Sequence, residues 1–302
     1  MKKLIEVLRL AWEYLAGKDV PEAKLSAEHL LAHVLGLDRL GLYLNFERPL
    51  SEQELELFRE FLRRRAAHEP LQYILGETGF RSLTLETGPG ALIPRPETEL
   101  LVDLALEFLD RRTHFPTPAL VLDLCCGAGA VGLALAMERE MIFCVLSDLS
   151  GPALGWAGRN LRRYVESLGG RTALCRSDLL EAFPARPMFD VILSNPPYVS
   201  PAEMQSLDRE IREYEPTEAL WGGGEDGTGV IERIVEQAAA RLCPGGMLAF
   251  EIGETQRTPV FRIFRGRAEL YSDPEFRTDL AGKDRFALAY RKEKRDEIPR
   301  ER

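Results

Sequence analysis

The stretch Phe189-Asp-Val-Ile-Leu-Ser-Asn-Pro-Pro-Tyr198 places a polar turn directly after a buried β-strand. Its first six residues form the short apolar run that is typical of such a strand. The strand has to end at Asn195-Pro-Pro-Tyr198, because proline has a fixed φ and no N–H to pair within a sheet. The turn therefore presents an amide side chain, outward-pointing carbonyls and an aromatic ring at the end of one strand.

These groups suit a planar amino group as their ligand. An exocyclic or amide –NH2 has two protons to donate, and we expect the side-chain oxygen of Asn195 and the carbonyl of Pro196 to accept them. Pro197 and Tyr198 complete the turn, with Tyr198 as an aromatic wall against the flat group. The nitrogen of such a group is a poor nucleophile. The turn therefore indicates an enzyme that transfers a methyl group to a planar nitrogen.

Apolar strand-like and helix-like runs alternate from residue 119 onward, which predicts an α/β fold with a mostly parallel sheet and helices on both faces. Strands are expected at 119–124, 142–147, 172–176, 191–194 and 247–252. Helices are expected at 100–109, 130–137, 152–168 and 229–242. Two further strands, at 268–271 and 286–290, are predicted to form a closing antiparallel hairpin, because no strong helix pattern separates them.

The N-terminal part of the chain has a different pattern. Apolar residues recur at helical spacing through residues 1–76, which predicts a small bundle of helices. Ser51-Glu-Gln-Glu54 is a capping box that starts one helix, and Gly36 is expected to end another. Residues 77–95 are predicted to be a β-hairpin linker with a turn at Gly88-Pro-Gly90. The α/β domain then spans 96–291, and the charged residues 292–302 are predicted to form a disordered tail.

Composition places the chain among ordinary globular proteins and excludes some classes of function. The 302 residues are 45% hydrophobic and 29% charged, with a formal net charge of -9, which argues against non-specific binding to a nucleic-acid backbone. No segment reads as a signal peptide or a membrane span, so we expect a cytoplasmic protein without membrane contact. Five cysteines without a Cys-x-x-Cys pair and four histidines predict buried thiols in a reducing compartment and no metal site.

The loop Asp123-Leu-Cys-Cys-Gly-Ala-Gly129 follows the first strand of the α/β domain and opens a helix. Gly127 and Gly129 permit a tight strand-to-helix turn and a close approach of backbone to ligand, as in dinucleotide sites. The full G-x-G-x-x-G pattern is absent, because Cys125 occupies the first glycine position. The residues expected to contact a cofactor here are Asp123, Cys125, Cys126, Gly127, Ala128 and Gly129.

Further acidic residues follow the next two strands and favour a nucleoside ligand. Asp148 stands where a carboxylate can take both ribose hydroxyls. Asp178 can accept from an adenine amino group, and Leu179 offers an apolar face to the ring. No P-loop lysine is present, which argues against a phosphate-bearing ligand. S-adenosylmethionine fits better, with Asp123 near its ammonium group and Asn195 at the far end of the site.

With these motifs the chain resembles the S-adenosylmethionine-dependent methyltransferases, and within them the peptide chain release factor protein-(glutamine-N5) methyltransferases (PrmC/HemK-like). The likeness covers nearly the whole length. Besides the loop and the turn it rests on Glu69-Pro-Leu-Gln-Tyr-Ile-Leu-Gly76, Leu92-Ile-Pro-Arg-Pro-Glu-Thr-Glu99, Glu215-Pro-Thr-Glu-Ala-Leu220, Phe250-Glu-Ile-Gly253 and Asp279-Leu-Ala-Gly-Lys-Asp-Arg285. Many family members carry Gly-Thr-Gly-Thr/Ser-Gly where this chain has Cys125-Cys-Gly-Ala-Gly129.

The resemblance implies a Rossmann-like seven-stranded class I methyltransferase domain preceded by a helical substrate-recognition domain. It also implies that the target is the glutamine of the Gly-Gly-Gln loop of release factors in translation termination, and that Asn195, Pro196 and Tyr198 are the catalytic residues. Arg95, Glu97 and Glu251 flank this site, and each either shapes the substrate channel or holds a structural ion pair.

Three other functions stay open at the level of sequence. Asn195-Pro-Pro-Tyr198 alone is shared with adenine-N6 methyltransferases, but these need a basic cleft for a nucleic acid. A glutamine methyltransferase of a ribosomal protein differs only in that the Arg95-Pro-Glu-Thr-Glu99 segment is specific to the release-factor enzymes. A non-catalytic binding module with a decayed cofactor loop would rest on Cys125 alone.

Overall fold

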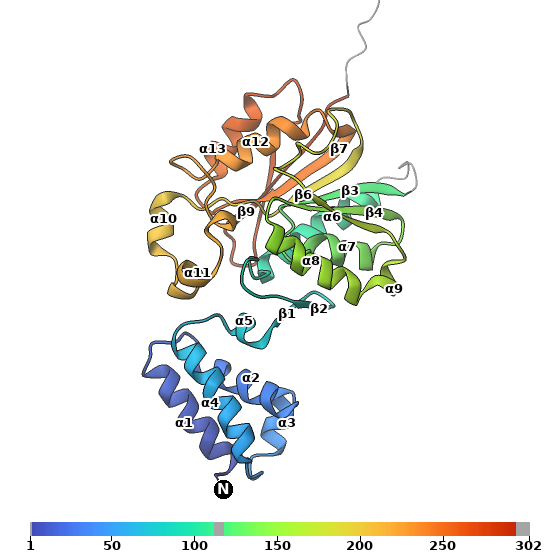
Figure 1. Cartoon of the computed structure of the whole chain (residues 1–302). Helices are drawn as coiled ribbons and strands as arrows, with labels where there is room; N and C mark the ends of the chain where they lie inside the picture. Colours follow the sequence, from blue (N-terminus) through green and yellow to red (C-terminus); the bar gives the residue numbers. More distant parts are fainter. Residues whose placement is uncertain (1, 112–117, 294–302) are drawn as a thin grey trace, which may run out of the picture. The chain divides into compact units, whose positions relative to one another are not determined.

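A computed structural model of the chain describes residues 2–111 and 118–293, which divide into two compact units. The first unit comprises Met1–Thr78, Thr87–Pro89 and Asp208–Glu215, and the second comprises Gly79–Glu86, Gly90–Leu207 and Pro216–Arg302. Figure 1 shows the N-terminal helices of the first unit in blue and the sheet of the second unit in green to red. The predicted tail lies, from residue 294 on, outside the described residues.

The first unit is a helical bundle, as its apolar spacing predicted. Its helices are α1 (Leu4–Ala16), α2 (Ala23–Leu35), α3 (Arg39–Leu44), α4 (Glu52–Ala66), α5 (Leu71–Leu75) and α11 (Arg209–Tyr214). The capping box of α4 is confirmed: the Ser51 hydroxyl accepts from the N–H of Glu54, whose carboxylate accepts from the N–H of Ser51. Gly36 ends α2 in the left-handed conformation, as expected.

The predicted hairpin consists of β1 (Glu77–Phe80) and β2 (Leu83–Glu86), but its turn lies elsewhere than expected. The strands are joined at Arg81, which has a φ of 51°, whereas Gly88-Pro-Gly90 follows the second strand. Arg81 tolerates this conformation because its guanidinium is held by Glu138 and Asp103. A long-range ion pair of this kind leaves no local signal in the sequence.

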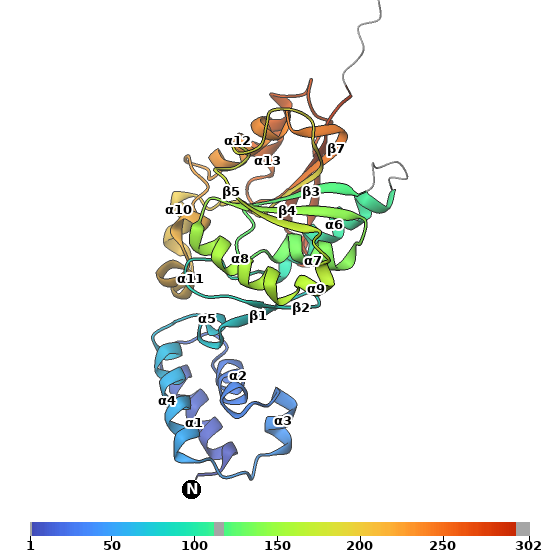
Figure 2. The ribbon, with the colours of Figure 1, turned by 45° about the vertical axis from the view of Figure 1, so that its right-hand side comes forward.

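The second unit is a seven-stranded sheet with the order β5-β4-β3-β6-β7-β9-β8. Five strands are parallel, and β9 runs antiparallel to both of its neighbours. Figure 2 shows β3, β4 and β5 side by side. The predicted Rossmann-like α/β class is thereby confirmed. The strands are β3 (Ala119–Leu124), β4 (Ile142–Asp148), β5 (Thr172–Arg176), β6 (Phe189–Ser194), β7 (Leu242–Glu251), β8 (Glu275–Thr278) and β9 (Asp284–Tyr290).

Helices cover both faces of this sheet, and each face has its own core (Figure 1). On one face α6 (Glu99–Arg111), α7 (Ala130–Glu138) and α8 (Gly151–Arg163) pack against the strands, and α9 (Val165–Leu168) follows α8. On the other face lie α12 (Gly229–Ala238) and α13 (Arg257–Arg265). The loop between β6 and β7 contains α10 (Pro201–Ser206) as well as α11. The central strands β3 and β6 therefore read as nearly continuous apolar runs, because both of their faces are buried.

The prediction for the closing hairpin is wrong in its first strand. Residues 268–271 form a turn and an isolated bridge, and the strand that pairs with β9 is β8 (Glu275–Thr278). Tyr271 is buried because its ring packs against Phe264 and its hydroxyl donates to the carbonyl of Val235. Its apolar neighbours therefore signalled burial rather than strand pairing. The helices α10, α11 and α13 were not predicted.

The order of the strands fixes where a ligand can bind. From β3 the chain adds β4 and β5 on one side, and β6 and β7 on the other. In open α/β sheets such a reversal leaves a crevice at the carboxyl ends of the two central strands. The motif Asp123–Gly129 comprises the end of β3 and the loop after it, and the turn Asn195–Tyr198 follows β6. The fold therefore brings the two predicted motifs to one crevice.

Candidate active site

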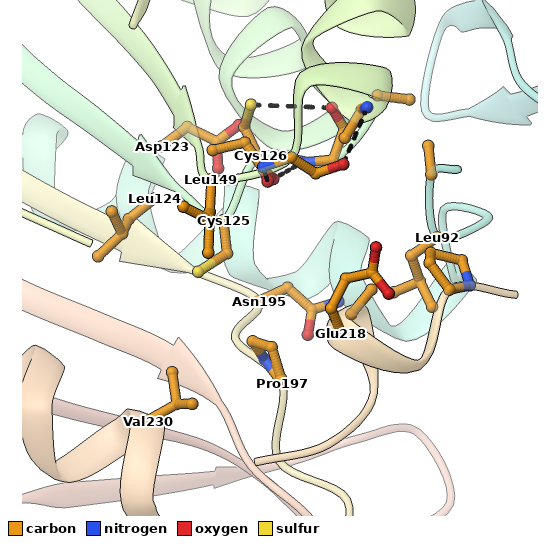
Figure 3. Close-up of a pocket in the computed structure, with 18 of the residues that line it drawn as sticks. Leu92, Asp123, Leu124, Cys125, Cys126, Leu149, Asn195, Pro197, Glu218 and Val230 are labelled. Atoms are coloured by element: carbon orange, nitrogen blue, oxygen red, sulfur yellow. Dashed lines mark hydrogen bonds between the residues drawn. The ribbon is translucent and has the colours of Figure 1, made fainter. Parts of the chain in front are cut away.

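A cavity of about 520 Å³ opens at the carboxyl ends of β3, β4, β5 and β6. Figure 3 shows Asp123 from the end of β3, Cys126 from the loop after it, and Asn195 and Pro197 from the turn after β6. Ten predicted site residues line it together: Asp123, Cys125, Cys126, Gly127, Ala128, Asp148, Asp178, Leu179, Asn195 and Pro197. The volume lies within the range of cofactor sites.

The loop after β3 is wound tightly by three residues with positive φ. Cys125, Gly127 and Gly129 have φ values of 58°, 57° and 86°. A Cβ at Gly129 would lie 2.9 Å from the side chain of Leu146, so this position has room for glycine alone. At Cys125 a side chain adopts a conformation that costs about 1 kcal/mol in non-glycine residues. The cysteine thus keeps the backbone path of the glycine that the pattern leads one to expect.

Asp123 is buried under this loop, with 1% of its surface exposed. One carboxylate oxygen accepts from the N–H of Gly132 in the first turns of α7, at 2.8 Å. Burial raises the pKa of Asp123 to about 7, against the opposing effect of that hydrogen bond. A Cβ at Gly132 would lie 3.0 Å from the carboxylate, so Gly132 is what lets the helix approach it.

Asp148 at the end of β4 braces the same loop. Its two carboxylate oxygens accept from the N–H of Gly127 and from the N–H of Ser150, each at 2.8 Å. Desolvation raises the pKa of Asp148. Each carboxylate oxygen has a second lone pair, so these bonds leave acceptor capacity for a ligand.

The end of β5 supplies Asp178 and Leu179. Leu179 is buried and has a φ of 47°, which turns the chain sharply into the cavity wall. The carboxylate of Asp178 forms an ion pair with Arg233 of α12 at 2.9 Å, which the sequence did not predict. Arg233 also lies 3.4 Å from Glu181.

The charge of the cavity wall favours a cationic ligand. Among its lining residues four are acidic, namely Asp123, Asp148, Asp178 and Glu218, and Arg233 is basic. A nucleotide phosphate would meet an excess of carboxylates, whereas a sulfonium with an ammonium group would be attracted. These acids, the tight loop and the volume fit S-adenosylmethionine.

The turn after β6 is held on both sides by hydrogen bonds. The amide nitrogen of Asn195 donates to the hydroxyl of Thr98 at 3.1 Å, and the hydroxyl of Tyr198 donates to Glu251 at 2.9 Å. Glu251 also accepts from Thr98 at 2.7 Å. Pro196 is buried. Burial raises the pKa of the Tyr198 hydroxyl, so the phenol stays protonated.

The glycine-rich segment 222–227 packs against this turn. Val199 pairs with Leu220 and Gly222 through backbone hydrogen bonds of 2.8 and 3.1 Å. The amide of buried Gln256 donates to the carbonyls of Tyr198 and Asp226, each at 2.7 Å.

The sequence did not predict a role for Gln256, Thr98 or Arg233. Thr98 stood within a quoted motif, but its role depends on partners about a hundred residues or more away.

Some predicted residues do not line the cavity. The lining does not include Gly129, which is the N-cap of α7, nor Pro196 and Tyr198 of the turn after β6. Arg95 directly precedes the short 3-10 helix Pro96–Thr98. Glu97 lies within this helix and is exposed. The positive charge of Arg95 acts to lower the pKa of the Tyr198 hydroxyl. The negative charge of Glu97 acts to raise the pKa of the Glu251 carboxyl.

Comparisons with known proteins agree with this geometry. Residues 6–76 match the family model of the PrmC N-terminal domain, and residues 100–213 match that of the methyltransferase small domain. The chain is 43% identical over 251 residues to a release factor glutamine methyltransferase of Geobacter sulfurreducens, covering 83% of this chain and 84% of that protein. It is 38% identical over 285 residues to one of Nitratidesulfovibrio vulgaris, covering 94% of each.

A solved structure shares the fold of the second unit. It is the T. thermophilus 16S rRNA N2 G1207 methyltransferase in complex with AdoMet and guanosine, with a TM-score of 0.50 and 20% identity over 72% of this chain and 50% of that one. The sheet order and the site define a class I methyltransferase, with S-adenosylmethionine as its cofactor. The chain belongs to the family of release factor glutamine methyltransferases, which confirms the resemblance seen in the sequence.

Two further observations concern the residues that the structure describes, 2–111 and 118–293. No helix there is long and apolar enough to cross a membrane. No cluster of three or more His, Cys, Asp or Glu side chains in these ranges is arranged to hold a metal ion.

The packing of Gly227 against the turn leads to a testable prediction. Gly227 and Gly224 both have a φ of 73°, but a Cβ at Gly227 would overlap the carbonyl oxygen of Tyr198 and lie 2.9 Å from Gln256. At Gly224 the nearest atom is 4.0 Å away. We expect Gly224→Ala to lower the free energy of unfolding by about 1 kcal/mol, through its left-handed conformation alone.

Gly227→Ala should lower the free energy of unfolding by roughly 3 kcal/mol and reduce methyl transfer, because the backbone at Tyr198 must shift. Urea unfolding and turnover of both variants measure these effects. Equal effects of the two substitutions would show that the close approach of Gly227 is unimportant.

Proposed function

We propose that this protein transfers the methyl group of S-adenosylmethionine to the side-chain N5 of the glutamine in the Gly-Gly-Gln loop of peptide chain release factors. The observation that carries the proposal is the placement of Asn195 on the wall of the cofactor cavity, with its amide nitrogen bound to Thr98. The names of the relatives support the choice of substrate. The net charge of -9 and the acidic cavity support a protein substrate over a nucleic acid.

The cofactor would be held by the residues that line the cavity. We propose that Asp148 takes the ribose hydroxyls, that Asp178 and Leu179 take the adenine ring, and that Asp123 lies near the ammonium group. The backbone of the loop Cys125–Gly129 would approach the cofactor closely, as its positive φ values permit. Bound there, S-adenosylmethionine supplies a sulfonium methyl group, which is an electrophile.

The chain's own residues would act on the substrate amide. A carboxamide nitrogen is a poor nucleophile, because its lone pair is delocalised into the carbonyl. The oxygen of Asn195 and the carbonyl of Pro196 would accept the two N–H bonds and hold the nitrogen toward the methyl group. Tyr198 would flank the flat amide. Acceleration then comes from positioning and preorganised acceptors, and the spare proton leaves to water after transfer.

The N-terminal helices would grip the release factor. The bundle has several large apolar side chains that are well exposed, including Leu40 and Leu44 of α3 at 65% and 76%. Exposed apolar groups on one small unit suit a protein partner. Cys125, Cys126, Cys144 and Cys175 carry free thiols, which supports a reducing cytoplasm as the place of action. Arg95 and Glu97 would border the channel that admits the glutamine.

The raised pKa of Asp123 predicts a pH-dependent affinity. The carboxylate must be ionised to attract an ammonium group, so affinity should fall as the pH drops below about 7. Between pH 7.0 and 5.5 we expect the Kd for S-adenosylmethionine to rise roughly tenfold in calorimetric titrations. Asp123→Asn keeps an acceptor for Gly132 and should bind weakly with a flatter pH profile. A constant Kd in the native protein would contradict the placement of Asp123 at the ammonium group.

Replacement of Asn195 tests the proposed mechanism. Asn195→Ala removes an acceptor that matters most as positive charge builds on the nitrogen. By comparison with lost oxyanion-hole donors we expect turnover to fall roughly 10²-fold, with the Kd for the cofactor changed only a few-fold. Single-turnover transfer of labelled methyl groups measures the chemical step. A rate near that of the native protein would rule the mechanism out.

Methyl transfer from labelled S-adenosylmethionine to purified release factor tests the function itself. The matched control is the same factor with the glutamine of its Gly-Gly-Gln loop replaced. We expect label on the intact factor and none on the control, which identifies substrate and site together. Absence of label on both, with cofactor binding intact, would overturn the assignment of release factors as the substrate.

A further inference from the structure

The hydroxyl of Thr98 lies between two side chains of the site and bonds to both. The amide nitrogen of Asn195 lies 3.1 Å from it, and a carboxylate oxygen of Glu251 lies 2.7 Å from it. Thr98 is 4% exposed and Glu251 is 2% exposed, so bulk water does not compete for these bonds. Asn195 itself faces the cofactor cavity (Figure 3). The three residues come from a 3-10 helix, the end of β7 and the turn after β6.

The direction of these hydrogen bonds follows from the chemistry of the three groups. An ionised carboxylate can only accept, and a hydroxyl has a single proton to donate. Once Thr98 gives its proton to Glu251, it can only accept from Asn195. Asn195 must then turn its –NH2 end toward Thr98, which leaves its oxygen for the substrate. The charge on Glu251 therefore sets the orientation of an amide that it does not touch.

Glu251 is itself fixed at both oxygens. The hydroxyl of Tyr198 donates to the second carboxylate oxygen at 2.9 Å. The positive charge of Arg285 favours the ionised form of Glu251, and burial opposes it and raises the pKa of the carboxyl. The negative charge of Glu97 also acts to raise the pKa of the Glu251 carboxyl. Arg285 is held in turn by Asp279, 3.4 Å away, so a basic group is placed for this carboxylate on the adjacent strand β9.

We propose that Thr98 and Glu251 are positioning residues that fix which end of the Asn195 carboxamide faces the substrate nitrogen. With the amide reversed, Asn195 would present N–H groups to the N–H groups of the target and repel it. The proposal rests on the proposed role of Asn195 as an acceptor. It adds that the acceptor is selected by a chain of hydrogen bonds running from Glu251 through Thr98.

The test is a double-mutant cycle between Thr98 and Asn195, with release factor as substrate and labelled S-adenosylmethionine as donor. Thr98→Val keeps the shape but neither donates nor accepts, and Thr98→Ser keeps the hydroxyl. Thr87→Val is the matched control, because the Thr87 hydroxyl is equally buried and has no hydrogen-bond partner among the described residues. Melting curves and the Kd for the cofactor are measured for each variant.

We expect Thr98→Val to lower kcat about tenfold, with KM changed less than kcat, and Thr98→Ser to restore most of the rate. In an Asn195→Ala background Thr98→Val should have almost no further effect, since the group that it orients is gone. Thr87→Val should leave the rate within about twofold of the native protein.

Two outcomes would overturn the proposal. One is an equal loss from Thr98→Val in the native and Asn195→Ala backgrounds, which would mean that Thr98 acts only through stability. The other is a loss from Thr98→Ser as large as that from Thr98→Val. A native-like rate of Asn195→Ala alone would instead refute the proposed role of Asn195, so the two failures are distinguishable.

Discussion

The parallel pairing of β3 with β6 is the constraint on which the rest of the site depends. Leu124 lies opposite Ser194 in this register, and the buried hydroxyl of Ser194 donates to the carbonyl of Leu124 at 2.8 Å. The next residues along the two strands are Cys125 and Asn195, which therefore leave the sheet side by side. A shift of one residue in the register would turn the side chains of β6 to the opposite face of the sheet. The loop after β3 and the turn after β6 are thus placed by one strand pair.

Much of this arrangement could be predicted from the sequence, because it follows from local patterns. The apolar runs of β3 and β6, the glycines of the loop and the two prolines of the turn each determine their own backbone. Alternation of strands and helices then implies that the carboxyl ends of the strands meet at one edge. The prediction of a strand at 268–271 was wrong because it relied on the same kind of pattern. Tyr271 is buried against α12 and α13 instead of belonging to a strand, and periodicity alone does not separate burial from strand pairing.

What the sequence could not predict depends on contacts between distant residues. The chain forms six alternating segments, so it passes five times between the two units. Helix α11 belongs to the N-terminal unit because the buried guanidinium of Arg65 pairs with Glu210 at 2.5 Å, 145 residues later. No pattern in the sequence around Arg65 or Glu210 indicates that the two residues form a pair. The same holds for Arg233 and Asp178, whose ion pair places a basic group at a cavity wall expected to be acidic.

The buried carboxylate of Glu251 raises a question of energetics. Burial of an ion costs several kcal/mol, and an apolar residue of similar volume often stabilises a fold better. Two hydrogen bonds and the charge of Arg285 offset this cost. Stability alone does not explain why such a group is present. An ionised carboxylate does have a property that a hydroxyl or a carboxamide lacks: it accepts hydrogen bonds and never donates them. Through Thr98 that direction reaches Asn195, whose two ends differ in chemistry but hardly in shape. An amide that has to present one particular end needs such an acceptor in its hydrogen-bond chain, and Glu251 supplies it without being among the residues that line the cavity.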